Sequence, residues 1–403
     1  MVGRSRAPHY RRSMNYMSRL DYFWSGRRYS EKTVRVIVGI ATALYHAFRL
    51  IPLGKKGSFD MKIVALVLAG GEGSRLYPLT AEHAKPALPF ASGFRIVDFV
   101  LSNLVNSKIS TIYLLAQYKP ASLIAHVETA WAPWFAGKPG SIKVLLPRSN
   151  TLGGQYKGTA DAVYQHLELL QAHNPDAVAV FAADHIYRMD VRQMAAFHFA
   201  HDADATIAAA TVPLENASSF GILAAGADGR VRDFREKPRN AACIPGRPDR
   251  AFASMGNYLF RPDVLEQWLR DARRVGDTDF GRDILPRVAP RGRVYAYDFT
   301  SNHVPGVQEH EERAYWRDVG TLSALAAAQQ DAMGMRPRFN LWNRRWPIRS
   351  ERDAAVLARM RDWKSRAAAA AQTEPRAQEP LKPVPAWQAS GTDRRTDERL
   401  LPS

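Results

Sequence analysis

The sequence predicts an α/β fold with a mostly parallel central sheet, on the strength of three observations. Apolar, β-branched runs typical of buried strands alternate along the chain with patterns of helical period. The first such run, residues 63–68, breaks directly into a glycine-rich turn at residues 70–73. Another, residues 178–183, ends in Asp184. Because open α/β sheets bind ligands at the carboxyl ends of their strands, both features are expected at one edge.

The remaining elements follow the same alternation. Strands are expected at residues 63–68, 111–116, 142–146, 178–182, 206–212, 255–260 and 294–299. Helical patterns lie between them, at residues 99–107, 121–130, 159–173, 191–200 and 262–274. Strands that alternate with helical segments predict a sheet covered by helices rather than an all-β fold.

The turn at residues 70–73 has the composition of a phosphate-binding loop. Gly70, Gly71 and Gly73 let the backbone approach a ligand closely, with free N–H groups directed at phosphate oxygens. Arg75 and Lys85 then supply the positive charge that a triphosphate requires. The pattern therefore predicts a nucleotide-phosphate site with its own cations, against the alternative of a tight turn with solvated charges.

Two commoner glycine motifs do not match this turn. A Walker A loop ends in Gly-Lys-Ser/Thr, whereas Ser74 and Arg75 follow the last glycine here. A dinucleotide fingerprint needs a further glycine at the position that Leu76 occupies. The site is thus expected to differ from both.

Composition and charge narrow the class of protein. The 403 residues are 46% hydrophobic, which is enough for a sizeable core. The single cysteine, Cys243, excludes an internal disulfide and fits a reducing compartment, so we expect a cytoplasmic location. Of the net charge of +17, residues 1–60 carry +9 and residues 350–403 carry +2. The part between them is only mildly basic, which suits anionic substrates and argues against nucleic acid as a partner.

Residues 1–60 are expected to be a basic amino-terminal extension that the chemistry does not need. Their apolar run, residues 36–48, has 13 residues, fewer than the roughly 20 that span a bilayer. No small-residue cleavage site of a signal peptide follows this run. Met61 opens directly on the first strand, so a start at Met61 is one reading. Surface association of an amphipathic helix with a membrane is the less favoured alternative.

Two aspartates are candidate metal ligands. Asp184 ends an apolar strand, and Asp318 stands just before a helical pattern at residues 322–333. Magnesium prefers one or two carboxylates together with phosphates and water, so the two side chains could hold one Mg²⁺. The alternatives are a turn or cap residue for Asp184 and an N-terminal turn carboxylate for Asp318.

Ordered motifs along the chain carry a resemblance to a known family. The turn and its cations match GGxG(S/T)RL…KP, the signature of sugar-nucleotide pyrophosphorylases. Over residues 62–349, the chain resembles the ADP-glucose pyrophosphorylases, the bacterial glucose-1-phosphate adenylyltransferases that supply glycogen synthesis. The further motifs are FRIVDFVLSN (94–103), AQYKPASLIAHV (116–127), GTADAV (158–163), ADHIYRMD (183–190), REKP (235–238), ASMGNYLF (253–260), YWRDVGT (315–321) and RRWPIR (344–349).

The resemblance implies a fold and a reaction. It implies a Rossmann-like nucleotidyltransferase sandwich, similar to the glycosyltransferase-A fold, with residues 61–349 as the catalytic domain. The implied reaction transfers the adenylyl group of ATP to α-D-glucose 1-phosphate and uses Mg²⁺. The phosphate of glucose 1-phosphate is already ionised, so no general base is needed, and His185 is read as structural.

The family also implies a role for each matching residue. Arg75, Lys85 and Asp184 would be catalytic, and Asp184 and Asp318 would hold the metal. The residues implied in nucleotide binding are Gly70, Gly71, Gly73, Gln117, Tyr156 and Gly158. Those implied in binding the sugar phosphate are Glu236, Lys237, Ser254 and Tyr258. Without the family, Glu236 and Lys237 would be read as a solvated turn.

The carboxyl end departs from the family's pattern. Its members continue with a left-handed parallel β-helix that builds the tetramer, whereas no hexapeptide repeat occurs in residues 350–403. We expect a helix over residues 352–371 and disorder beyond about residue 373. A homo-oligomer stays open, but the tetramer is not expected. Two alternatives to the adenylyltransferase also stay open: a non-catalytic or regulatory paralogue, and a nucleotidyltransferase with another base or sugar.

Overall fold

The computed structural model describes residues 61–91, 93–148, 154–351, 353 and 355. The expectations for residues 1–60 and those for the tail, including the expectation that it forms no β-helix, lie outside these residues. Among the helices within the described ranges, none combines the length and the apolar character needed to cross a membrane.

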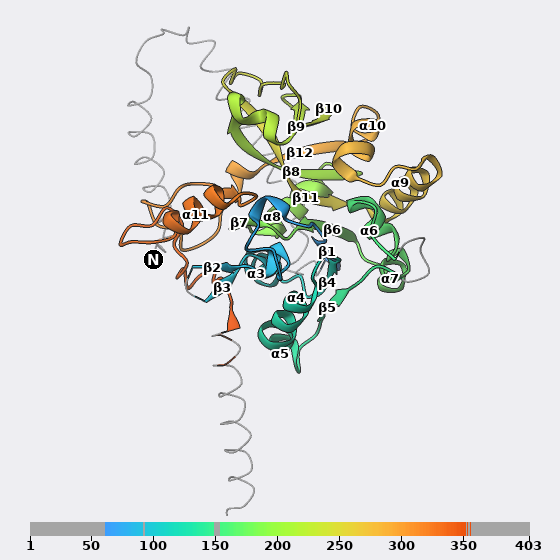
Figure 1. The fold of residues 1–403 in the computed structure, drawn as a ribbon. Helices are drawn as coiled ribbons and strands as arrows, with labels where there is room; N and C mark the ends of the chain where they lie inside the picture. Colours follow the sequence, from blue (N-terminus) through green and yellow to red (C-terminus); the bar gives the residue numbers. More distant parts are fainter. Residues whose placement is uncertain (1–60, 92, 149–153, 352, 354, 356–403) are drawn as a thin grey trace, which may run out of the picture. The chain divides into compact units, whose positions relative to one another are not determined.

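A nine-stranded sheet forms the centre of the fold (Figure 1), in the order β10-β9-β11-β6-β1-β4-β5, with β8 paired to β11 and β12. Since β11 is antiparallel to β6, β8 and β9, and β10 is antiparallel to β9, seven of the nine strands share one direction. This confirms the predicted fold class and the seven expected strands. The strands are β1 (Ile63–Ala69), β4 (Thr111–Ala116), β5 (Ser141–Leu145), β6 (Ala177–Ala182), β8 (Ala205–Pro213), β9 (Gly221–Ala225), β10 (Val231–Glu236), β11 (Arg250–Phe260) and β12 (Val294–Asp298).

Helices cover both faces of the sheet, as Figure 1 shows for α6, α7 and α9 on one side and α3 to α5 on the other. Successive side chains of β1 point to opposite faces of the sheet, so the strand contributes to a core on each face. Ala65 and Val67 belong to the core with α3, α4, α5 and α8. Val64 and Leu66 belong to the core with α6, α7, α9 and α10. The helices are α3 (Val97–Asn106), α4 (Ala121–His126), α5 (Ala132–Phe135), α6 (Thr159–Tyr164), α7 (Leu167–His173), α8 (Val191–Ala200), α9 (Pro262–Val275), α10 (Leu285–Val288) and α11 (Leu322–Asp331).

The prediction of a single helix over residues 159–173 is wrong, because two helices occupy this range. The helix ends with α6 at Tyr164, and α7 begins at Leu167. Between them, Gln165 and His166 turn their side chains inward and are 5% exposed. Their side chains contact the segment before the helix, where Gln165 donates to the carbonyl oxygen of Gln155 and His166 lies within hydrogen-bond distance of the Tyr156 hydroxyl.

A third apolar cluster supports two small antiparallel sheets beside the main one. It joins Phe99 of α3 and Leu325 of α11 to Ile186, which belongs to β7. One small sheet pairs β7 with β13, and the other pairs β2 with β3. Their bounds are β2 (Pro89–Phe90), β3 (Phe94–Arg95), β7 (His185–Tyr187) and β13 (Trp316–Asp318). β7 follows the carboxyl end of β6 directly in the chain, so its pairing brings β13 to that end of the sheet.

Candidate active site

One large cavity, of about 720 Å³, lies where β1 and β6 end. All fourteen site residues predicted from the sequence line it. They are Gly70, Gly71, Gly73, Arg75, Lys85, Gln117, Tyr156, Gly158, Asp184, Glu236, Lys237, Ser254, Tyr258 and Asp318. Segments far apart in the sequence are therefore brought to one place, and the cavity can be described from its acidic centre outward.

The acidic centre is assembled by the pairing of β7 with β13. Asp318 lies directly opposite His185 in this ladder, and Asp184 precedes His185. The Nε2 atom of His185 lies 3.5 Å from Asp184 Oδ1 and 3.9 Å from Asp318 Oδ1. A backbone pairing, rather than any local motif, thus brings the two carboxylates together.

Lys85 offsets part of the negative charge of these two carboxylates. Its Nζ atom lies 2.8 Å from Asp184 Oδ2 and 3.6 Å from Asp318 Oδ1, and the lysine is buried. Burial alone would raise the pKa of Asp184, but the neighbouring His185 and Lys85 outweigh burial and hold that pKa at about 2. Asp184 is therefore an anion throughout the neutral range and is about one-third exposed to the cavity.

The donor set fits a hard divalent cation. Ligand atoms of Asp184, His185 and Asp318 all lie within 4.8 Å of one another. Two carboxylates open to a phosphate-sized cavity are the ligands that Mg²⁺ prefers. An ammonium group already lies between these oxygens, so the centre is built to hold positive charge. The residues present are thus compatible with the predicted magnesium site.

Two glycines leave space for the side chains of Lys85 and Arg75, the two predicted cations. Gly73 has a left-handed φ of 68°, and a Cβ there would lie 3.1 Å from that of Lys85. A Cβ at Gly320 would lie 3.0 Å from the guanidinium of Arg75. The Arg75 side chain consequently lies over Gly320, beside the carboxylate of Asp318.

At the other end of the cavity, two glycines make room for Glu236. A Cβ at Gly221 would lie 2.9 Å from Glu236 Oε2, and one at Gly281 would lie 3.1 Å from the same oxygen. Lys237 follows in the left-handed region with φ of 46°, and its N–H donates to Phe220 O at 2.9 Å. A non-glycine residue in this conformation is uncommon and is typical of functional sites.

A bulge in β11 places the last pair of predicted residues. The register of the pairing between β11 and β8 shifts between Ser254 and Tyr258. Gly256 lies in this bulge and has a φ of 67°. A Cβ at Gly256 would lie 3.1 Å from that of Ala182, so β11 approaches the end of β6 closely here. The hydroxyl oxygens of Ser254 and Tyr258 lie 3.5 Å apart and both side chains line the cavity.

The opposite wall is formed by Gln117, Tyr156 and Gly158. A Cβ at Gly70 would lie 3.8 Å from both Gln117 and Tyr156, so these side chains border the glycine-rich turn. Gln117 also accepts a hydrogen bond from the N–H of Tyr156. Gly158 allows the backbone of Thr278 to pass, since a Cβ would lie 2.4 Å from its carbonyl oxygen.

Comparisons with known proteins show which family this chain resembles. The family model described as nucleotidyl transferase matches residues 64–334. A curated glucose-1-phosphate adenylyltransferase of Thermodesulfovibrio yellowstonii is 48% identical over 292 residues, covering 72% of this chain and 71% of the relative. Those of Mycobacterium tuberculosis and Thermus thermophilus are also 48% identical, over 74% and 72% of this chain and 74% and 71% of their own lengths.

The chain belongs to the nucleotidyl transferase family. Sequence reasoning gave no site role to Asp279 or His185, which also line the cavity of this nucleotidyl transferase. Asp279 lines the cavity, and its carboxylate accepts hydrogen bonds from the Thr159 hydroxyl at 2.8 Å and from the Gly281 N–H at 2.9 Å. In the sequence, Asp279 occurs in the run Asp-Phe-Gly at residues 279–281. This run indicates a helix cap and does not by itself indicate a binding site. His185 was read as structural, yet its imidazole faces the carboxylates of the cavity.

Proposed function

We propose that this chain transfers the adenylyl group of ATP to α-D-glucose 1-phosphate, giving ADP-glucose and pyrophosphate, as a source of ADP-glucose for glycogen or a related α-glucan. The relatives that carry the name glucose-1-phosphate adenylyltransferase support this reaction. The observation that carries the proposal is that one cavity holds a glycine-rich turn, a carboxylate pair bridged by Lys85, and the Glu236–Lys237 pair.

The chemistry is an in-line displacement at phosphorus. A phosphate oxygen of glucose 1-phosphate attacks the α-phosphorus of ATP and forms the new phosphorus–oxygen bond. The bond from the α-phosphorus to the oxygen that bridges to the β-phosphate breaks, and pyrophosphate leaves with that electron pair. Both reacting phosphates are ionised, so the protein has to align two anions and offset their charge, and no proton has to be moved first.

The glycine-rich turn and its cations would bind the triphosphate. In the proposal, N–H groups of the turn at residues 70–73 donate to phosphate oxygens, and Arg75 and Lys85 offset the charge on the departing pyrophosphate. Gln117, Tyr156 and Gly158 would form the nucleoside wall. The support is that these residues line one cavity and that Gln117 and Tyr156 lie next to Gly70.

The other end would bind glucose 1-phosphate. Glu236 would accept hydrogen bonds from sugar hydroxyls, and Lys237 would bind the phosphate. Ser254 and Tyr258 would contact the sugar. The left-handed backbone at Lys237 and the space left by Gly221 and Gly281 around the carboxylate of Glu236 support this assignment.

Asp184 and Asp318 would hold Mg²⁺, as nucleotidyl transferases typically use this ion. When bound there, Mg²⁺ would supply charge neutralisation for the phosphates of ATP. The two carboxylates also orient Lys85, whose ammonium group they contact directly. Formation of a homo-oligomer and a cytoplasmic location stay predictions.

Pyrophosphate release tests the proposal directly. The purified chain is given glucose 1-phosphate and Mg²⁺ with ATP, dTTP, CTP, GTP or UTP in parallel. Release with ATP alone, lost in Asp184→Asn, is the expected result. Asp271→Asn on α9 is the matched control, because Asp271 pairs with Arg274 on the surface and does not line the cavity within the described chain.

Each other outcome contradicts a stated part of the proposal. Release with a different nucleotide would overturn the base assignment and retain the displacement chemistry. Absence of release from folded protein that still binds ATP would instead favour the non-catalytic paralogue. Release that persists unchanged in Asp184→Asn would remove Asp184 from the proposed centre.

A further inference from the structure

The nucleoside wall of the cavity is a short backbone segment, residues 155–158, without a helix or strand of its own. Tyr156, Lys157 and Gly158 line the cavity. The ring of Tyr156 borders Gly70, the first glycine of the turn that receives the phosphates in the proposed function. Because loop backbone is intrinsically free to move, the position of this segment has to be fixed by other groups.

Two buried side chains on one face of α6 and the turn after it hold the backbone of this segment. Asp161 Oδ2 accepts hydrogen bonds from Lys157 N and from Gln165 Nε2, both at 2.9 Å. The same amide of Gln165 donates to Gln155 O at 3.2 Å. The spacing of four residues between Asp161 and Gln165 places them on the same side of the helix.

Gln165 also contacts the chain that follows β5. Its Oε1 atom accepts a hydrogen bond from Arg148 N at 3.0 Å, just beyond the end of β5. One buried amide therefore ties the backbone of Arg148 to that of Gln155. Since buried amides are costly to leave unpaired, each of these bonds favours a single backbone position.

His166 fixes the side chain of Tyr156 itself. Its Nε2 atom lies 2.8 Å from the Tyr156 hydroxyl oxygen, and the imidazole is buried. Burial, reinforced by the charge of Arg148, lowers the pKa of His166 to about 4. The imidazole is thus neutral at physiological pH and its contact with the phenol is an ordinary neutral hydrogen bond, independent of pH above about 5.

We propose that Asp161, Gln165 and His166 are positioning residues for the nucleotide: they hold residues 155–158 in the conformation that receives the nucleoside end. The inference rests on the proposed function of the cavity. Within the described chain, these three side chains are not among those that line the cavity, so they act through the segment and not by contact with the ligand. Preorganisation of this kind lowers the entropic cost of binding.

The proposal predicts a selective kinetic defect. Gln165→Met and His166→Phe should each raise KM for ATP about three- to tenfold, the effect of one buried hydrogen bond, with KM for glucose 1-phosphate within about twofold of wild type. His166→Gln, which retains a polar amide, should recover most of the affinity. Equilibrium binding of ATP by titration calorimetry gives the same comparison without turnover.

His198→Phe is the matched control for the loss of a buried histidine. His198 is buried, its Nδ1 atom lies 2.9 Å from Thr206 Oγ1, and its pKa is likewise lowered to about 4, chiefly by burial. It does not line the cavity in the described chain. This variant should lose stability and keep KM for ATP.

A double-mutant cycle tests the route through Tyr156. If His166 acts by holding the phenol, then Tyr156→Phe combined with His166→Phe should raise KM for ATP no more than the worse single variant. Multiplicative losses, equal rises in KM for both substrates, or lower stability with unchanged KM for ATP would each overturn the proposal. If wild type uses another nucleotide, the proposed function fails separately, and the same cycle is measured with that nucleotide.

Discussion

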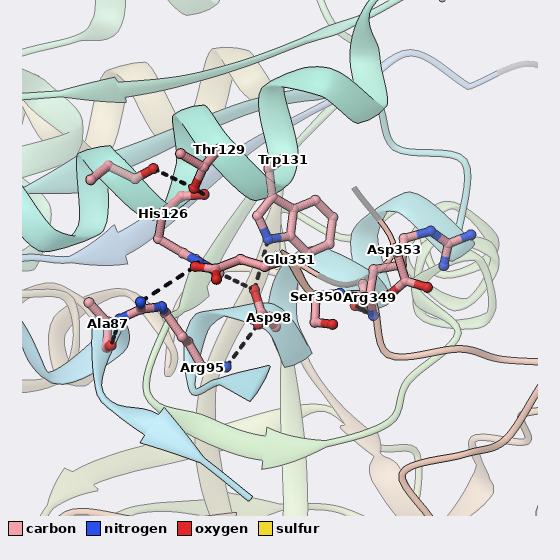
Figure 2. Close-up of polar contacts among 12 residues, drawn as sticks. Ala87, Arg95, Asp98, His126, Thr129, Trp131, Arg349, Ser350, Glu351 and Asp353 are labelled. Carbon is pink, nitrogen blue, oxygen red and sulfur yellow. Dashed lines mark hydrogen bonds and ion pairs between the residues drawn. The ribbon is translucent and has the colours of Figure 1, made fainter. Parts of the chain in front are cut away.

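The imidazole of His126, at the end of α4, lies between two carboxylates, with its Nε2 atom 2.6 Å from Asp98 Oδ1 and its Nδ1 atom 3.1 Å from Glu351 Oε1 (Figure 2). Asp98, on α3, is fully buried and also accepts hydrogen bonds from Trp131 Nε1 and Arg95 N, each at 2.8 Å. His126 therefore joins α3 and α4 to the chain at Glu351.

This arrangement predicts a pH-dependent stability. Burial and the charge of Arg95 oppose protonation of His126, but Asp98 and Glu351 outweigh them, so its pKa is raised above 6.5. A histidine with a raised pKa contributes stability that is complete below pH 6.5 and is lost as the pH rises through the raised value. The free energy of unfolding, measured in urea from pH 6 to 9, should therefore fall with rising pH, and His126→Phe should reduce this slope.

The control for that slope is again His198→Phe. The pKa of His198 is lowered by burial, so its contribution is complete above pH 6.5 and is lost only as the pH falls towards 4. His198→Phe should consequently leave the slope above pH 6.5 unchanged. A slope in His126→Phe equal to that of wild type would show that folding does not raise the pKa of His126.

Gly221→Ala should impair binding of the sugar phosphate selectively. A Cβ at residue 221 would lie 2.6 Å from Phe234 Cζ and 2.9 Å from Glu236 Oε2, so the carboxylate has to move. KM for glucose 1-phosphate is expected to rise at least about tenfold, with KM for ATP unchanged. Gly246→Ala, where a Cβ meets nothing within 4 Å, should alter neither KM. A Gly221→Ala enzyme with normal KM for glucose 1-phosphate would argue against the role of Glu236.

The parts of the fold that depend on local pattern were predictable from the sequence. The strand 63–68 and the glycine-rich turn adjoin in the chain, and their composition alone placed a phosphate site at a strand end. The meeting of Asp184 with Asp318 was not predictable from spacing, because it depends on the pairing of β7 with β13. Resemblance supplied the residues proposed to bind the sugar phosphate, because Glu236 and Lys237 resemble a solvated turn in the sequence. Only the structure shows Gly221 and Gly281 beside the carboxylate of Glu236.

The break between α6 and α7 could not be predicted from the sequence pattern. Gln165 and His166 occur within a run of helical period, and nothing in the run itself signals that both side chains are buried. Their partners, Gln155 and Tyr156, precede the helix in a segment without periodicity. Helix propensity describes the chain's own preference, whereas here hydrogen bonds to another segment decide where the helix ends.

Lys85→Gln should reduce turnover far more than stability. Removing this ammonium group takes away a cation that would offset charge in the transition state, so kcat is expected to fall about 10²- to 10³-fold. Lys143→Gln, at an exposed position on β5, is the control and should retain wild-type kcat. Steady-state pyrophosphate release measures both. A fall in kcat below about threefold for Lys85→Gln would exclude Lys85 from charge stabilisation.

The buried pair of Arg188 and Glu311 should stabilise the fold next to β7. Arg188 directly follows β7; its guanidinium lies 3.0 Å from Glu311 Oε2 and 4.2 Å from the centre of the Phe339 ring. Both charged side chains are at most 4% exposed, so Arg188→Met leaves a buried carboxylate without its cation and should cost about 3–5 kcal/mol of unfolding free energy.

The combined variant separates the ion pair from general packing. Arg188→Met together with Glu311→Gln removes both charges and should cost less than the sum of the single changes, because neither partner is left alone. Urea unfolding measures this coupling. Because neither residue lines the cavity within the described chain, the single variants should lower kcat only where the protein begins to unfold. Additive losses would mean that the two residues contribute through packing and not through their mutual charge.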